Sequence, residues 1–128
     1  MAQHVSWIEH QGKRIMVVSY AGLKDEEAYL RAVDEFEAAT LAQSPGRRFR
    51  VIVDVHDSAL TPRITQRNKE VMNKAAEHGI PDCPTALVGL SGLKLAVVQA
   101  LQFFRPDLYV AADFESAKDW LVAQEIED

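Results

Sequence analysis

The sequence is poor in several features that would place it in a special class of protein. One cysteine among 128 residues cannot form a disulfide within the chain. No apolar run approaches the roughly 18 residues that a membrane span requires. The amino-terminal stretch MAQHVSWIEH has neither the basic start nor the apolar centre of a signal peptide. We therefore expect a single cytoplasmic domain over residues 1–128, with no membrane span and no disulfide support.

Positive charge is also scarce. Lys and Arg number 14 against 19 Asp and Glu, which gives a formal net charge of -5. Binding to nucleic acid or to an anionic membrane depends on clustered Lys and Arg, so this charge argues against both kinds of partner. A short basic cluster, Arg47, Arg48 and Arg50, is expected to be the solvated entrance of a strand rather than an anion site.

What the sequence does have is a regular alternation of strand and helix patterns. Two β-favouring runs, VSWIEH and RIMVVSY, flank a short turn at Gly12 and predict a hairpin. Three further strands are predicted at FRVIVDV, TALVGL and LYVAA. Four helices are predicted, at KDEEAYLRAVDEFEAATLAQ, from Thr61 to Gly79, at SGLKLAVVQALQFF and at DFESAKDWLVAQ. The predicted order is β-β-α-β-α-β-α-β-α.

This alternation predicts the arrangement of the sheet. Strands that alternate with helices need crossover connections, so the later strands should be parallel, with helices on both faces. The first strand should be antiparallel to the second. The unbroken Val and Ile run of FRVIVDV indicates burial on both faces, which is usual for a central strand. The predicted fold class is α/β, with a mixed, mostly parallel five-stranded sheet and four helices.

Helical spacing also predicts which residues face the core. Asp25, Glu26 and Glu27 fall in the first turn of the first helix, where the helix dipole favours them. Thr61 and Asp113 are expected to cap the second and the last helix. The residues predicted to point inward are, in chain order, Tyr29, Val33, Phe36, Thr40, Ile64, Val71, Met72, Ala75, Phe114, Ala117 and Leu121.

The turn GLSGLK, after the strand TALV, invites comparison with phosphate-binding loops. It has neither the length nor the Gly-Lys-Ser/Thr ending of a Walker loop, and it lacks the third glycine of the dinucleotide pattern. Ser91 is expected instead to cap the third helix, with Gly89 and Gly92 letting the turn approach a neighbouring backbone. The alternative is an anion or polar headgroup held by the free N–H groups of this helix start, assisted by Lys94 or Arg63.

His56 and Asp57 follow the predicted central strand, at the place where open sheets tend to bind ligands. They are therefore candidates for binding an anion or another ligand. Neighbours on an extended chain point to opposite sides, however, so their adjacent numbers do not make them a catalytic pair.

Signals of catalysis and of metal binding are weak. The candidate nucleophiles are Ser58, Ser91 and Cys83. None lies in a nucleophile-elbow pattern, and Cys83 has no cationic neighbour in the sequence to lower its pKa. His4 and His10 are too far apart on a strand to chelate one ion, and His78 has no second ligand at helical spacing. We expect a protein that is not an enzyme and that binds neither metal nor cofactor.

The third predicted helix is apolar around more of its surface than a helix that covers a sheet requires. Leu101 and Phe104 belong to one wide apolar arc, whereas Leu95 and Val98 lie among polar residues on the other side. We expect part of this helix to contact a second subunit, most simply in an isologous homodimer, or to line an apolar ligand pocket. The alternative is a monomer with two scattered aliphatic residues on its surface.

Three stretches of the sequence resemble a known family. They are DVHDSALTP (residues 54–62), ALVGLSGLK (86–94) and FESAKDWL (114–121), and they are similar to the SpoIIAA-like bacterial proteins of STAS and CRAL-TRIO type. The resemblance covers nearly the whole chain and implies a STAS fold. In the related anti-sigma-factor antagonists, Asp-Ser-Ser-Gly begins the helix after the central strand, and a partner kinase phosphorylates a serine there. The matching stretch here reads ALTPR, without the serine pair and the glycine.

The resemblance makes Thr61 and, more weakly, Ser58 the candidate phosphoacceptors. A phosphoryl group is compatible with the dipole at a helix start, and the alternative is that Thr61 only caps the helix. The family implies a non-catalytic binding or regulatory module with a protein partner. Its CRAL-TRIO side implies the alternative function, a carrier of an apolar small molecule such as a lipid, held near the third helix.

Overall fold

The computed structural model describes residues 4–92, 95–96, 98–99 and 107–126. The described chain is of the predicted α/β class, with a five-stranded mixed sheet and three helices. The helix predicted over SGLKLAVVQALQFF lies largely outside the described residues. The elements are β1 (Val5–His10), β2 (Lys13–Ser19), α1 (Glu26–Leu41), β3 (Arg50–Asp54), α2 (Pro62–Glu77), β4 (Thr85–Val88), β5 (Leu108–Ala111) and α4 (Phe114–Ala123).

The strands lie side by side in the order in which they occur in the chain, β1-β2-β3-β4-β5. β1 is antiparallel to β2, and each later pair is parallel. Both features confirm the prediction, as does the central position of β3, whose residues Val51 and Ile52 are buried. The β1–β2 hairpin turns at Gln11 and Gly12, which both have positive φ (51° and 79°). Such a two-residue turn matches the twist of the strands that it joins.

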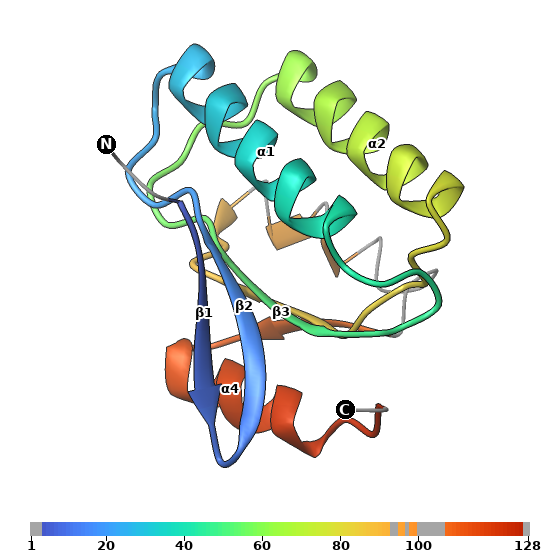
Figure 1. The fold of residues 1–128 in the computed structure, drawn as a ribbon. Helices are drawn as coiled ribbons and strands as arrows, with labels where there is room; N and C mark the ends of the chain where they lie inside the picture. The colour runs from blue at the N-terminus through green and yellow to red at the C-terminus, as the bar shows by residue number, and fades with distance from the viewer. Residues whose placement is uncertain (1–3, 93–94, 97, 100–106, 127–128) are drawn as a thin grey trace.

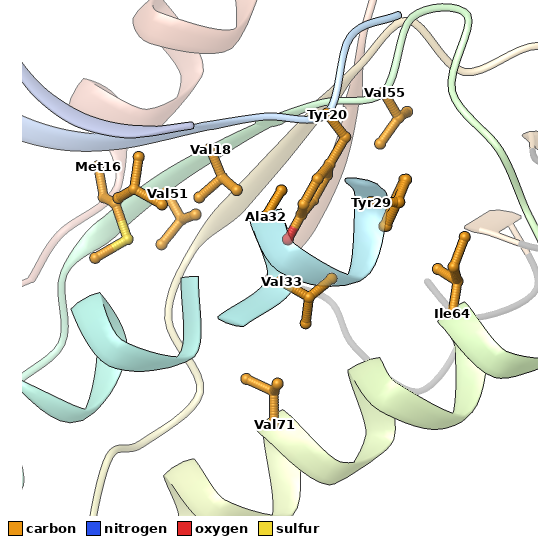
Figure 2. Packing of buried hydrophobic residues seen from close by; sticks show 11 residues of the cluster. Met16, Val18, Tyr20, Tyr29, Ala32, Val33, Val51, Val55, Ile64 and Val71 are labelled. Carbon is orange, nitrogen blue, oxygen red and sulfur yellow. The ribbon is translucent and has the colours of Figure 1, made fainter. Parts of the chain in front are cut away.

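Helices cover both faces of the sheet, as predicted. Figure 1 shows α1 and α2 on one side and α4 on the other. Alternate residues of β2 supply the two cores, because successive side chains of a strand point to opposite faces. Met16 and Val18 face α1 (Figure 2), whereas Ile15 packs in the cluster that contains Leu121 of α4.

The helix starts follow the capping rules. The side chains of Thr61 and Asp113 accept hydrogen bonds from the backbone N–H of Ile64 and Ser116, which confirms both predicted caps. Asp25 was expected within the first turn of α1, but it is the N-cap and accepts from the backbone N–H of Ala28.

The inward stripe of α2 is narrower than predicted. Ile64 and Val71 are buried, but Met72 is 50% exposed, so its predicted inward position is wrong. Ile64 and Val71 are seven positions apart and share one helix face, whereas Met72 lies about 100° further round the axis. α2 therefore buries only the side that meets α1 and the core (Figure 2).

Arg50 is the second departure from the predictions. Arg47 and Arg48 are exposed as expected of a solvated strand entrance, but Arg50 is only 2% exposed. Its Nε donates to the carbonyl oxygen of Leu121 at 2.9 Å, and one of its terminal nitrogens donates to that of Gln124 at 3.0 Å. These carbonyls lie at the end of α4, where a helix has unpaired acceptors and a partial negative charge that a guanidinium satisfies. Arg50 thus joins β3 to α4.

Replacing Arg50 with Met should lower the free energy of unfolding by about 3 kcal/mol, because the carbonyls at the end of α4 lose a charged donor. Urea denaturation measures this change. Arg47→Met is the matched control, and it should shift stability by less than about 0.5 kcal/mol because Arg47 is exposed. Equal effects of the two substitutions would contradict the role given to Arg50.

Candidate functional site

A shallow, open hollow lies at the carboxyl ends of β3, β4 and β5, and we call it the carboxyl-edge hollow. It has a volume of about 450 Å³. Its described lining residues are His56, Gly89, Leu90, Ser91, Leu95, Val110, Ala111 and Ala112. The structure thus brings together His56, Ser91 and Leu95, three residues that the sequence analysis had singled out for different reasons.

His56 is held by an acidic residue that the sequence analysis missed. The Nδ1 atom of His56 lies 2.7 Å from Oδ1 of Asp54, and the backbone N–H of His56 donates to the same oxygen at 3.1 Å. An ionised carboxylate only accepts, so Nδ1 carries the proton in this contact and Nε2 remains to contact a ligand. The i, i+2 spacing was the available signal, because such residues share one side of an extended chain. Asp57, in contrast, is exposed and has a positive φ of 51°.

Gly89 is required by the close approach of His56. A Cβ atom at Gly89 would lie 2.5 Å from ring atoms of His56 and 2.7 Å from its backbone nitrogen. The φ angle of Gly89, 88°, is also one that other residues rarely adopt. The predicted close approach is therefore confirmed at Gly89. At Gly92 no atom of the described residues lies within 4 Å of an added Cβ, and a φ of 58° favours glycine there.

The loops beside the hollow are joined to one another by backbone hydrogen bonds. The N–H of Gly22 donates to the carbonyl of His56 at 2.8 Å, and the N–H of Ala59 donates to that of Leu23 at 2.9 Å. The hydroxyl of Ser58, one of the two candidate phosphoacceptors, donates to the carbonyl of Val55 at 2.8 Å. The chain after β3 is therefore tied to the chain after β2.

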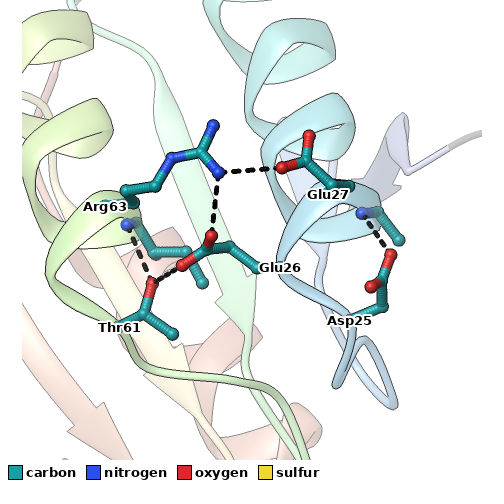
Figure 3. A network of polar contacts seen from close by, with 7 residues as sticks. Asp25, Glu26, Glu27, Thr61 and Arg63 are labelled. Atoms are coloured by element: carbon teal, nitrogen blue, oxygen red, sulfur yellow. Dashed lines mark hydrogen bonds and ion pairs between the residues drawn. The ribbon is translucent and has the colours of Figure 1, made fainter.

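Thr61, the other candidate phosphoacceptor, lies in a polar network that joins the starts of α1 and α2 (Figure 3). Its hydroxyl donates to Glu26 at 2.5 Å while accepting from the N–H of Ile64 at 3.2 Å. Arg63 donates to Glu26 at 2.9 Å and to Glu27 at 2.8 Å. The hydrogen bond and charge of Glu27, followed by those of Glu26, raise the pKa of the Arg63 guanidinium.

In this network Arg63 pairs with carboxylates of α1, whereas the alternative interpretation of the turn GLSGLK had Arg63 or Lys94 assist an anion there. Arg63 is not among the described residues that line the carboxyl-edge hollow, and it already binds two carboxylates. Ser91 is exposed at the rim of the hollow. Lys94, the other cation expected to assist an anion there, lies outside the described residues.

The surface expected to bind a second subunit or an apolar ligand is described only in part. Leu95 and Val98 are both half-buried, and Leu95 lines the carboxyl-edge hollow. Leu101 and Phe104 lie outside the described residues. The interface expected of these four residues stays a prediction.

Leu60 is an exposed apolar residue that the sequence analysis passed over. It is 47% exposed, in the loop that connects β3 to α2. The signal was present, because an aliphatic residue in the polar loop DSALTP has no helix or strand pattern to bury it. Leu60 and the carboxyl-edge hollow thus belong to the same edge of the sheet.

Cys83, one of the candidate nucleophiles, is buried. Burial raises the pKa of the Cys83 thiol, which disfavours the nucleophilic thiolate. In the described ranges no group of three or more His, Cys, Asp or Glu side chains is arranged to hold a metal ion. Within the same part of the chain, no helix combines the length and the apolar character needed to cross a membrane.

Comparison with known proteins leaves the family open. No family model matches the sequence, and the search of curated proteins found no match.

Replacing Gly89 with Ala should lower the free energy of unfolding more than the same replacement at Gly46. Both glycines have a φ above 80°, but only at Gly89 does the new Cβ meet other atoms. Gly46→Ala should cost about 1 kcal/mol for its backbone conformation. Gly89→Ala should cost about 2 kcal/mol more, because His56 must shift. Thermal unfolding measures both. His56→Ala should rescue Gly89→Ala only in part, since the backbone nitrogen still lies close.

Thr61→Val should lower the free energy of unfolding by about 1 kcal/mol, because the isosteric side chain neither caps α2 nor donates to Glu26. Thr61→Ser keeps the hydroxyl and is the matched control. Urea denaturation of both variants measures the difference, and equal losses would show that the hydroxyl contributes nothing.

Proposed function

We propose that the protein is a non-catalytic binding and regulatory module of the SpoIIAA-like STAS type, and that it binds a protein partner through the carboxyl edge of its sheet. One observation carries the proposal, namely that an exposed leucine, Leu60, and an open hollow occur at the same edge. Contiguous apolar patches with a polar rim are typical of interaction surfaces, and in this proposal Leu60 belongs to such a patch. Leu60 supplies an anchor for the partner, and the hollow receives one of its side chains.

The shape of the hollow favours a protein over a small molecule. A binding pocket for a small molecule usually encloses most of its ligand, whereas the carboxyl-edge hollow is shallow and open. A partner protein can cover such a surface and exclude water around a single inserted side chain.

The loops at this edge are already held in one conformation before a partner binds. Backbone hydrogen bonds at Gly22, Ser58 and Ala59 hold the chain after β3 in place. Little conformational entropy is then lost when a partner binds, which leaves more of the contact energy for affinity. His56, oriented by Asp54, offers the partner a hydrogen bond of defined direction.

Regulation at Thr61 is part of the proposal. A phosphoryl group there would replace the hydroxyl that donates to Glu26 and would bring further negative charge beside Glu26 and Glu27. Arg63 would then be drawn to the phosphate and away from the two carboxylates. The start of α2, next to Leu60, would move with it.

A small-molecule carrier is the second candidate. Leu90, Leu95 and Val110 give the hollow an apolar side, which suits a ligand such as a lipid chain. Native mass spectrometry separates the two candidates. A carrier retains a small molecule that is released on denaturation, whereas phosphorylation adds a mass that stays on the chain.

A photo-crosslinking residue at Leu60 should capture a protein from the native host, whereas the same residue at Met72 should not. The two positions are matched in exposure, 47% and 50%, but Met72 lies on α2 away from the loop. The captured band should disappear when Gly89→Ala or a bulky Ser91→Trp change alters the hollow. Capture of the same proteins at both positions, or at neither, would count against this binding surface.

A further inference from the structure

The outer edge of β1 is open for pairing. β1 is the first strand of the sheet, and no other strand among the described residues lies on its outer side (Figure 1). The N–H of Ser19 donates to the carbonyl of His4, which sets the alternation of the β1–β2 ladder. Val5, Trp7 and Glu9 therefore direct their backbone N–H and C=O groups away from the sheet. We call this row of groups the β1 edge.

The β1 edge has few of the devices that usually prevent strands from pairing, and Glu9 is the one acidic residue on it. Its sequence, VSWIEH, contains no proline and no lysine. The register with β2 runs without a bulge from Val5 to His10. Exposed edges of this kind are templates for another strand.

A second hollow lies directly beside this edge, between β1 and α1. It measures about 450 Å³ and is lined by Val5, Ser6, Trp7, Glu35, Ala38 and Ala39. Trp7 is half-buried, and the guanidinium of Arg14 lies over its ring, 4.3 Å from the centroid. One edge thus carries a half-buried aromatic ring that packs against Phe49, a hollow with small side chains, and charges of both signs.

We propose that the β1 edge pairs with the β1 edge of a second copy of this chain, antiparallel and with Ser6 on the two-fold axis. Val5 then lies opposite Trp7 of the other copy, and the two exchange both backbone hydrogen bonds. The reciprocal pair forms by symmetry. Each Trp7 ring lies next to Val5 of the other copy and enters the hollow beside Ala38 and Ala39.

Charge complementarity selects this register. The guanidinium of Arg14 lies over the Trp7 ring, so in this pairing it approaches Glu35 of the other copy. Within its own chain Glu35 accepts from the backbone N–H of His4 at 3.0 Å through Oε1, and its Oε2 lies 4.0 Å from Nε2 of His4. A pairing with Trp7 on the axis would instead bring Arg14 against its own symmetry mate. It would also place Glu9 opposite Val5, beside Glu35, where two carboxylates repel. A parallel pairing would align Glu9 with Glu9.

This interface is independent of the proposed function, which uses the carboxyl edge of the sheet. It also differs from the surface of Leu95, Val98, Leu101 and Phe104 that the sequence analysis expected to dimerise. The two dimers are distinguished by substitutions, because the β1 edge and that surface share no residue.

Cysteine crosslinking tests the register. With Ser6 on the axis, the two Ser6 residues form a non-hydrogen-bonded pair with Cα atoms about 4.5 Å apart, a distance that a disulfide spans. Ser6→Cys should therefore give a covalent dimer under mild oxidation. Glu9→Cys is the control, because Glu9 is also exposed but lies far from its mate in this register. The wild-type chain should stay unlinked, since Cys83 is buried.

Charge reversal tests the complementarity without altering the core. Arg14→Glu and Glu35→Lys should each weaken dimerisation in sedimentation equilibrium about threefold, and the double variant should restore it. Leu95→Glu with Val98→Glu should leave the dimer intact. Circular dichroism checks that each variant is folded.

Three results would overturn the proposal. One is a wild-type chain that sediments as a monomer at millimolar concentration while Ser6→Cys stays unlinked. Another is crosslinking at Glu9→Cys in place of Ser6→Cys. The third is a dimer that dissociates on Leu95→Glu with Val98→Glu and is insensitive to charge at Arg14 and Glu35.

Discussion

The rest of the structure depends on the burial of β3 on both faces. Val51 points into the cluster shared with α1 and α2, and Ile52 points into the cluster shared with α4. A strand with apolar side chains on both sides is stable only when both are covered. This requirement sets the three layers of the domain. It also brings the carboxyl ends of the parallel strands to one edge, where the loops are free to vary.

Local sequence signals were sufficient to predict most of the strands, helices and turns of the fold. The hairpin at Gly12, the caps at Thr61 and Asp113 and the apolar run of β3 each depend on a few neighbouring residues. Arg50 could not be placed in this way, because the carbonyls that it binds are 71 and 74 residues further along the chain. Met72 was misplaced because periodicity gives the direction of an apolar stripe and not the width that a neighbouring helix covers.

The candidate site was predictable in its position and not in its contacts. The sequence singled out His56 at a strand end, Ser91 at a helix start and Leu95 on a helix surface, without showing that one hollow contains all three. The partner of His56, Asp54, is two residues away, a spacing that puts both side chains on one side of an extended chain. Asp57, next to His56 in the sequence, has a positive φ and is exposed. Arg63 was named, with Lys94, only in the alternative interpretation of the turn GLSGLK as an anion site, and in the structure it pairs with Glu26 and Glu27 of another helix.

The sequential strand order has a consequence for how the protein is made on the ribosome. Each new strand meets a partner that has already emerged, so the sheet can grow in the order of synthesis. The face that contains Ile15 and Ile52 has no such advantage, because α4 is the last of these elements to be translated. Until then these side chains are exposed on the nascent chain. A chain that ended before α4 would leave this apolar face of the sheet uncovered.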